Sequence, residues 1–256
     1  MIKKLIIFLS IVILTTYNSE CQIQQVIDSI LGQDGKEEIF KLELLVVDDC
    51  STDNTQDILS ANNIKFLTTS KNTGGPNHGR NIALSKCTGD YICISDHDDI
   101  WFSHKISKLL SVVDSAPIVT SGYNLLDKSS GNKASRVNVA ADNSGYILYS
   151  RNDTFISKLT KSNIGQQTYL GSIMFSSSFK SILFEEEYGM IDFDWILRLF
   201  NGQESVEVCE ALYLRNVDGL NLSLNEQYRI NDYYYSLESI EKYRCIFEKE
   251  VRLGEK

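Results

Sequence analysis

The chain has 256 residues, 43% of them hydrophobic and only two of them proline, so it can bury one large core and would normally form one domain. Its formal charge of -9 argues against a nucleic acid partner, because phosphate backbones are bound through positively charged surfaces. The six cysteines are scattered, with no C-x-x-C spacing, which indicates isolated thiols of a reducing compartment rather than a disulfide scaffold.

The first apolar run of the chain has two interpretations. With Lys3 and Lys4 before it, the run is similar to the basic start and apolar core of a secretory signal. The small-residue cleavage site is missing, because Tyr17 and Glu20 stand where small residues are needed. A continuous run of Leu, Ile and Val, such as residues 9–14, is also typical of a parallel strand that is buried on both faces.

The following residues alternate between helical and strand periodicity. The predicted elements, in chain order, are a helix ending at Gly32, a strand at 42–47, a helix from about Asp53, a short strand at 64–69, a Gly-rich loop and helix at 74–86, and a strand at 90–95. Such an alternation predicts an α/β fold with a doubly wound, mainly parallel sheet and flanking helices.

Ligands of doubly wound sheets bind at the carboxyl ends of the strands. Three predicted strands deliver polar or acidic groups there, at residues 15–17, 48–49 and 96–99. The first of these strands is the N-terminal apolar run, and cleaving it would remove the leading strand of the sheet. We therefore interpret residues 9–14 as a strand and expect the protein to be cytoplasmic.

An acidic cluster, Asp96, Asp98 and Asp99, follows a buried strand. Like charges this close repel each other unless a cation or hydrogen bonds compensate them. Mg²⁺ binds through one or two carboxylates and completes its octahedron with water and substrate phosphates, so the cluster favours a divalent cation site over an acidic surface turn. The earlier acidic turn is not an EF-hand, because Asn54 and Ser60 stand where Gly and Glu are required.

Six segments carry a recurring set of motifs: "SIVILTTYNSE", "QVIDSILGQ", "LELLVVDDCSTDNT", "NTGGPNHGRNIAL", "GDYICISDHDDIW" and "MIDFDWILRLF". In order and spacing they resemble the signatures of family 2 inverting glycosyltransferases with the GT-A fold. The resemblance covers residues 9–105 and recurs at 189–224. It implies transfer of a sugar from a nucleotide-diphosphate sugar to an acceptor hydroxyl, in the synthesis of a bacterial surface polysaccharide such as O-antigen or capsule.

The resemblance also implies a nucleotide-sugar-binding set. It places Thr15 and Tyr17 at the nucleotide base and has Asp49 accept a hydrogen bond from the imide or amino edge of that base. Glu20 belongs to the same set, and Arg80 falls near the diphosphate or near the strand that supports it.

Asp96 and Asp98 match the D-x-D element of the family. The resemblance implies that Asp98 is the ligand of Mg²⁺ or Mn²⁺ and that Asp96 and Asp99 bind the nucleotide sugar. Two departures stand out: Leu14 replaces the usual Pro, and Cys50 replaces the usual Gly of the acidic turn. A cysteine there must avoid a positive φ or accept its cost.

The second half of the chain holds the catalytic candidates. The pattern of residues 188–200 predicts a helix with Asp192 at its start and Asp194 on a different face. The family carries a carboxylate general base here, and Asp192 followed by Arg198 fits that spacing, with Ile191 in place of the usual Glu. An alignment with Asp194 as the base is the alternative, and both acids also suit the positive end of the helix dipole.

Residues 117–176 predict a strand, a polar hairpin and a later strand in which Gly171 allows a close backbone approach. The resemblance makes them part of a GT-A domain over 1–224, with a nucleotide-sugar half at 1–105 and an acceptor half at 106–224. Residues 225–256 predict a helical tail. Its mixed charge excludes a polybasic anchor, while its tyrosines suit a partner or a membrane interface.

The expected partners are the nucleotide-sugar donor and a glycan or lipid-linked glycan acceptor, with peripheral association at the inner face of the membrane. Two alternatives are an inactive nucleotide-sugar-binding module of the same fold and a nucleotidyltransferase. The second expects a Gly-rich phosphate loop with a basic residue after the first strand, where this chain has "TTYNSE".

Overall fold

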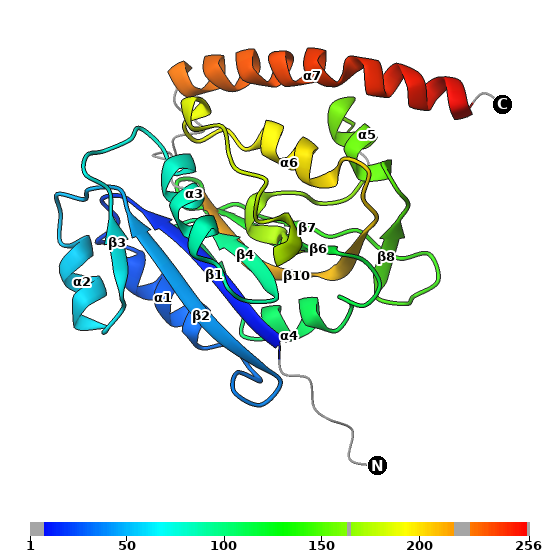
Figure 1. The fold of residues 1–256 in the computed structure, drawn as a ribbon. Helices are drawn as coiled ribbons and strands as arrows, with labels where there is room; N and C mark the ends of the chain where they lie inside the picture. The colour runs from blue at the N-terminus through cyan, green and yellow to red at the C-terminus, as the bar shows by residue number, and fades with distance from the viewer. Residues whose placement is uncertain (1–7, 163–164, 218–225, 255–256) are drawn as a thin grey trace.

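The computed structural model describes residues 8–162, 165–217 and 226–254. The described residues do not include Lys3 and Lys4, nor do they include positions 218–224, which are part of the family resemblance. The described chain forms a central sheet with helices on both faces (Figure 1).

The secondary structure follows the predicted alternation through the first half of the chain. The strands are β1 (Phe8–Thr16), β2 (Phe40–Asp48), β3 (Phe66–Thr68), β4 (Tyr91–Ser95), β5 (Asp99–Trp101), β6 (Ile118–Asp127), β7 (Lys133–Arg136), β8 (Tyr146–Tyr149), β9 (Met174–Ser176) and β10 (Ser205–Val217). The helices are α1 (Ile23–Leu31), α2 (Thr55–Ala61), α3 (Asn77–Lys86), α4 (Lys105–Leu110), α5 (Asp153–Leu159), α6 (Phe193–Phe200) and α7 (Glu226–Gly254). Short 3₁₀ turns are η1 (Leu170–Ser172), η2 (Ser177–Phe179) and η3 (Glu186–Tyr188).

The sheet has a parallel half and a mixed half. Its order is β3-β2-β1-β4-β9-β6-β10-β5, with β7 paired to β6 and β8 paired to β10. The pairs among β1, β2, β3 and β4 are parallel, as predicted, and so is the pair of β6 and β10. The antiparallel strand β9 joins the two halves.

Strand β1 lies between β2 and β4. Val12 and Leu14 belong to the apolar layer on one face of the sheet, whereas Ile11 and Ile13 belong to the layer on the other face. Successive side chains of a strand point to opposite faces, so a strand covered on both faces is apolar throughout. The interpretation of residues 9–14 as a strand is confirmed.

Helices cover each apolar layer. On one face, α1 and α4 contribute Val26 and Ile106 to the core. On the other face, α3, α6 and α7 contribute Leu84, Trp195 and Tyr243. The α/β class with flanking helices is therefore confirmed.

Helix α7 crosses the top of the molecule in Figure 1 as one long element, as predicted for the tail. It buries Ser236, Ser239 and Tyr243 and exposes a stripe formed by Ile230, Tyr233, Tyr234 and Leu237. Within the part of the chain that the structure describes, no helix combines the length and the apolarity needed to cross a membrane.

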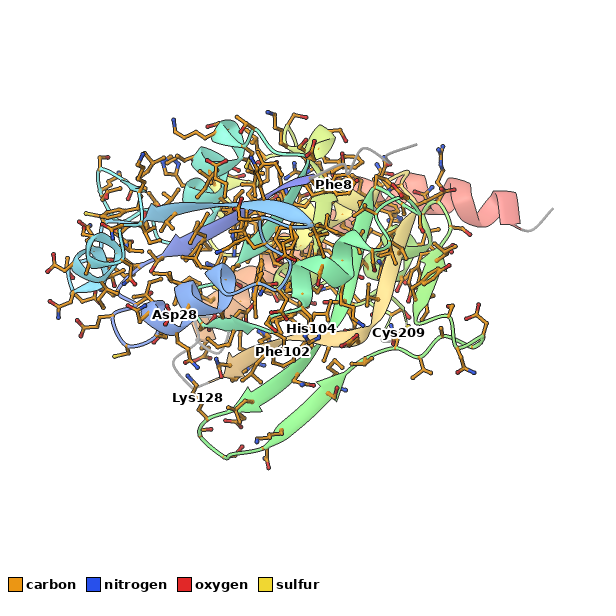
Figure 2. The ribbon with its side chains drawn as sticks, turned by 90° about the horizontal axis from the view of Figure 1, so that it is seen from below. Phe8, Asp28, Phe102, His104, Lys128 and Cys209 are labelled. Atoms are coloured by element: carbon orange, nitrogen blue, oxygen red, sulfur yellow. The ribbon has the colours of Figure 1, made fainter. Side chains whose placement is uncertain are left out.

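The second half also contains the predicted hairpin. Strands β6 and β7 form it, and Figure 2 shows the hairpin projecting from the body, with Lys128 at its turn. Gly171 lies in the turn η1 rather than in the later strand, but the expected close approach is present. A Cβ at Gly171 would overlap Asp99 Oδ2 and lie 3.0 Å from the ring of Tyr213.

The 13-residue strand β10 has no matching expectation from the sequence. Its pairing with β6 shifts register between Val208 and Ala211 and again between Ala211 and Leu214, which breaks the period-two pattern. The strand also buries Glu207, whose carboxylate accepts a hydrogen bond from Asn138 Nδ2 at 2.9 Å. A buried acid and two bulges remove the signal on which strand prediction depends.

Candidate active site

The carboxyl ends of β1, β2 and β4 meet at one edge of the sheet. Thr16 stands opposite Asp48 in the ladder of β1 and β2, and Leu14 stands opposite Ser95 in the ladder of β1 and β4. The residues that follow these strands, 17–20, 49–55 and 96–99, therefore share the edge where the strand and helix alternation predicts a ligand.

Asp49 follows β2 and is buried. Its carboxylate accepts hydrogen bonds from the Thr69 hydroxyl at 2.8 Å, the Thr73 hydroxyl at 2.9 Å and the Thr73 amide at 2.9 Å. A carboxylate has about four lone-pair sites, so one is left for a ligand. Asp49 thus holds the loop of residues 69–73 at the edge of the sheet.

The loop after β1 is tied to the loop after β2, since the Asn18 amide donates to the Ser51 hydroxyl at 2.9 Å. Thr15 is buried at the end of β1, whereas the side chain of Tyr17 is 40% exposed. Of these two predicted base contacts, Tyr17 presents the larger accessible surface to a ligand.

Glu20 makes local contacts at the start of α2. Its carboxylate accepts hydrogen bonds from the Asn54 amide at 3.0 Å and from Asn54 Nδ2 at 2.7 Å. Asp53 in turn accepts the amides of Glu20 and Thr55, each at 3.0 Å. Both acids therefore stabilise the N-terminus of α2, and no described contact joins Glu20 to the acidic cluster.

Cys50 adopts a left-handed backbone conformation with φ of 64°. Of the two alternatives for a cysteine at the usual glycine position, the chain accepts the cost of the positive φ. A residue with a Cβ loses about 1–2 kcal/mol in this region.

Replacing this residue by glycine, Cys50→Gly, is expected to raise the free energy of unfolding by up to about 1 kcal/mol, because the lost Cβ clash outweighs the added backbone entropy of the unfolded chain. Cys50→Ala is the matched control, since it removes the thiol and keeps the Cβ. Urea unfolding curves measure both variants. An equal gain for the two would contradict the strain explanation.

Arg80 is buried in α3 and pairs with the acidic cluster. Its Nη2 donates to Asp96 Oδ1 at 2.7 Å, and its Nη1 donates to Asn77 Oδ1 at 3.0 Å. The guanidinium also lies 5.2 Å from the ring centroid of Phe184. These contacts favour the role of supporting the end of the strand, because they orient the Asp96 carboxylate.

The other two acids of the cluster have raised pKa values. Burial, followed by the charge of Asp96, raises the pKa of Asp98. Asp99 is fully enclosed, and burial together with the charges of Asp96 and Asp98 holds its pKa well above the usual range. The cluster therefore carries like-charge repulsion that Arg80, Lys105 and Arg215 only partly offset, and a cation beside Asp98 would reduce it further.

The donor atoms of this cluster suit Mg²⁺ or Mn²⁺, which prefer carboxylate oxygens. Among the residues that the structure describes, no three His, Cys, Asp or Glu side chains gather into a cage for an ion. A metal ion here would take one or two ligands from the protein and the rest from substrate and water. Asp96 and Asp98 are both partly exposed, and Asp96 also pairs with Arg80, so either carboxylate can reach an ion at this edge.

Sequence reasoning missed the cation beside Asp99. Lys105 is fully buried, its Nζ donates to the Gly171 carbonyl, and it lies 4.0 Å from the ring centroid of Trp101 and 4.4 Å from that of Tyr213. Burial lowers the pKa of Lys105 to about 8. No local pattern marks a lysine for such a position, because its partners come from other elements.

Arg215 is a second missed cation. It stands opposite Asp99 in the ladder of β5 and β10 and places its guanidinium carbon 4.6 Å from the ring centroid of Tyr169. The Tyr169 ring is 45% exposed and meets Tyr123 edge-on at 5.0 Å. The short apolar run "ALYL" before Arg215 is the one local signal of a strand here, and two register shifts of β10 interrupt it.

Asp192 reaches this edge from the second half of the chain. It stands at the N-terminal boundary of α6 and is partly exposed. Burial raises the pKa of Asp192. The charge of Arg80 lowers this pKa, and the charge of Asp96 raises it. A carboxylate from the second half therefore lies within electrostatic range of the acidic cluster, and a raised pKa suits a general base working near neutral pH.

Asp194 is buried in an ion-pair network instead. Its Oδ2 lies 2.6 Å from Arg198 Nε, and its Oδ1 lies 3.7 Å from Lys242 Nζ of α7. Arg198 also lies 3.6 Å from Glu185. Asp194 thus joins α6 to α7, and the geometry favours Asp192 of the two catalytic candidates.

The Gly-rich loop and the first residue of α3 hold the segment that leads to Asp192. The Asn77 amide donates to the Gly189 carbonyl at 3.1 Å, and Asn77 Nδ2 donates to the Ile191 carbonyl at 3.2 Å. Gly75 comes so close that a Cβ there would lie 2.5 Å from the carbonyl carbon of Gly189. This backbone contact explains the glycine physically and positions the candidate base.

The sequence model of Glycosyl transferase family 2 matches residues 11–185, which include β1 and the acidic cluster. The chain belongs to glycosyl transferase family 2. Solved structures show the fold of this family 2 chain: Staphylococcus aureus TarS 1–349 in complex with UDP has a TM-score of 0.68 and 21% identity, covering 90% of this chain and 64% of that one. The structure of the same protein with UDP-GlcNAc has a TM-score of 0.68 and 21% identity, and the match covers 87% of this chain and 64% of that one.

Curated relatives match parts of the family 2 chain. Poly(ribitol-phosphate) beta-N-acetylglucosaminyltransferase TarS of Staphylococcus aureus is 40% identical over 92 residues, 34% of this chain and 16% of its own length. Poly(ribitol-phosphate) beta-glucosyltransferase of Bacillus spizizenii is 36% identical over 93 residues, which are 34% of this chain and 14% of that protein. Glycosyltransferase GlyG of Streptococcus pneumoniae is 32% identical over 128 residues, which are 47% of this chain and 41% of that protein. The matched segments span less than half the length of these relatives.

Proposed function

We propose that the chain is an inverting glycosyltransferase that moves a sugar from a nucleotide-diphosphate sugar to an acceptor hydroxyl during synthesis of a bacterial surface polysaccharide. The observation that carries the proposal is Asp192, a carboxylate with a raised pKa that lies within electrostatic range of Asp96 and Arg80. Inversion requires the acceptor to attack from the face opposite the leaving diphosphate, and an alcohol needs a base for that attack.

The residues at the strand edge have separate roles in binding the donor and in catalysis. Tyr17, Thr15 and Asp49 take the nucleotide base, and the buried Asp99 supports the sugar site from behind the acidic cluster. Asp98 would hold Mg²⁺ or Mn²⁺, whose charge stabilises the leaving diphosphate when the ion is bound. Asp192 removes the proton of the acceptor hydroxyl as that oxygen attacks the anomeric carbon.

We extend the proposal to an acceptor that is an anionic or lipid-linked surface glycan. Two relatives are named for poly(ribitol-phosphate), an anionic polymer. The exposed rings of Tyr233 and Tyr234 on α7 suit peripheral contact with the inner face of the membrane. The use of β1 as an internal strand supports a cytoplasmic enzyme, because signal cleavage would remove it.

The test is a panel of nucleotide sugars, each incubated with the protein, Mg²⁺ or Mn²⁺, and candidate acceptors. We expect release of a nucleoside diphosphate that an acceptor accelerates. Release of pyrophosphate would identify a nucleotidyltransferase instead. A thermal shift with donor and no turnover under any condition would identify an inactive binding module.

A further inference from the structure

An exposed aromatic ring lies beside the acidic cluster. Tyr169 is 45% exposed, and its ring centroid lies 4.6 Å from the guanidinium carbon of Arg215. Arg215 stands opposite Asp99 in the ladder of β5 and β10. The next residue, Asn216, donates from Nδ2 to the Asp98 carbonyl at 2.7 Å. The end of β10 therefore connects the Tyr169 ring to the cluster.

The segment that carries Tyr169 contacts the cluster a second time. Gly171 follows Tyr169 by two residues, and it approaches Asp99 so closely that a Cβ there would overlap Asp99 Oδ2. The Gly171 carbonyl also accepts a hydrogen bond from the buried ammonium group of Lys105. Two separate contacts, one through Arg215 and one through Gly171, place Tyr169 at the edge of the site.

The backbone on either side of Tyr169 is fixed by hydrogen bonds. On the N-terminal side, the buried Gln166 accepts from Ser205 Oγ at 2.6 Å and donates to Thr120 Oγ1 at 2.9 Å. On the C-terminal side, the amide and the hydroxyl of Ser172 donate to the Tyr169 carbonyl at 2.8 Å and 2.6 Å. Because this backbone is already ordered, a ligand that packs on the ring has little ordering cost to meet.

The surroundings of the ring favour a flat, apolar ligand surface. A single exposed aromatic side chain is ordinary, but Tyr169 also meets the buried ring of Tyr123 edge-on at 5.0 Å. Tyr123 and Arg215 hold the ring in one orientation and leave nearly half of the side chain accessible. A pyranose presents C–H groups on its faces, and the negative π-face of an aromatic ring attracts such groups.

We propose that Tyr169 is the platform on which a sugar ring of the acceptor packs, so that the acceptor presents a pyranose rather than an open-chain polyol to the site. The inference rests on the proposed function and adds to it the class of the acceptor. The strand ends of the first half take the donor, whereas Tyr169 comes from the second half of the chain, as Asp192 does. Arg215 is a positioning residue, because it holds the ring.

Acceptor kinetics with ring variants test the platform. The probes are methyl β-glucopyranoside, methyl β-galactopyranoside, the methyl β-glycoside of N-acetylglucosamine, and ribitol as the open-chain comparison. Tyr169→Leu is expected to raise the KM for the preferred pyranoside by about tenfold, because the stacked ring is lost. Tyr169→Phe keeps the ring and is expected to stay within about twofold of the wild type. The KM for the donor stays the same in both variants.

Tyr146→Leu is the matched control. Tyr146 is 36% exposed, so the substitution removes a comparable ring from the surface. It pairs with Val208, near the other end of β10 from Arg215. Its KM for the pyranoside and its kcat are expected to equal those of the wild type.

Four kinetic results would overturn the platform. An unchanged acceptor KM in Tyr169→Leu would show that the acceptor does not contact the ring. An equal loss in Tyr169→Phe would assign the contact to the hydroxyl group. A rise in the donor KM alone would place the transferred sugar there instead. Turnover by the wild-type protein with ribitol and with none of the pyranosides would exclude a ring acceptor.

Saturation-transfer NMR separates this inference from the proposed function, because it needs no turnover. If the wild-type protein releases no nucleoside diphosphate from any donor, the proposed function fails, and the NMR result decides about the platform. Transfer from the protein to the C–H protons of one face of a methyl pyranoside, lost in Tyr169→Leu and kept in Tyr169→Phe, supports a sugar platform. No transfer to any pyranoside, or equal transfer in Tyr169→Leu, overturns it.

Discussion

Replacing the candidate base, Asp192→Asn, is expected to lower kcat by at least about a hundredfold while the KM for the donor stays the same. The acceptor hydroxyl loses the group that takes its proton, whereas the donor is held at the strand edge by other residues. Steady-state kinetics with saturating donor and varied acceptor measure the effect.

The pH profile provides a second readout of the same group. Burial raises the pKa of Asp192, and only the ionised carboxylate accepts a proton. The wild-type kcat/KM is therefore expected to fall as pH decreases through this raised pKa. The Asp192→Asn variant is expected to lack that acidic limb.

Asp194→Asn is the matched comparison, because it makes the same change two residues away. We expect a smaller loss of kcat and a larger loss of stability, about 1–3 kcal/mol, since the buried carboxylate binds Arg198 at 2.6 Å. Urea unfolding and kinetics on both variants separate the two effects. If Asp194→Asn lost more activity than Asp192→Asn, the base would be Asp194.

The second large effect is expected at the acidic cluster. Asp98→Asn should reduce turnover by about a thousandfold or more, because the charge stabilisation supplied by a catalytic metal ion is worth several kcal/mol. Folding should be unaffected or slightly improved, because the pKa of Asp98 is raised by burial and by the charge of Asp96. Removing such a charge relieves repulsion in the folded state.

Turnover in a titration of Mg²⁺ or Mn²⁺, with Mn²⁺ binding followed by electron paramagnetic resonance, measures this effect. Asp114→Asn removes the same charge from an exposed turn and serves as the control. Full activity of the wild-type protein in excess chelator would show that the metal assignment of Asp98 is wrong.

Most of the first half of the fold is predictable from the sequence. Each strand from β1 to β4 is read from apolar residues that are adjacent in the chain, and each helix from a period of 3.6. In β1, burial on both faces leaves no polar position to confuse the pattern, as Ile11 and Val12 show by entering opposite layers. The edge where polar groups gather then follows, because parallel strands share their carboxyl ends.

The second half was less predictable, because its elements are specified by distant partners. Strand β10 buries Glu207 against Asn138 and shifts its register on β6. Lys105, the last residue of the first half, depends on second-half partners, because a carbonyl of Gly171 and the ring of Tyr213 stabilise it in the core. These partners lie tens of residues away in the sequence, so no local period or motif indicates them.

The sequence alone determined the family resemblance, the acidic cluster and two candidate bases at the start of one helix, with Asp192 preferred for its spacing to Arg198. The tertiary structure adds that the two acids have different surroundings. Helix α7 brings Lys242 to 3.7 Å from Asp194, which together with Arg198 commits that carboxylate to an ion pair, while the charges of Arg80 and Asp96 act on Asp192. A sequence pattern ranks two neighbouring acids of a helix only by their spacing, whereas the charges that packing places around each acid come from residues far away in the chain.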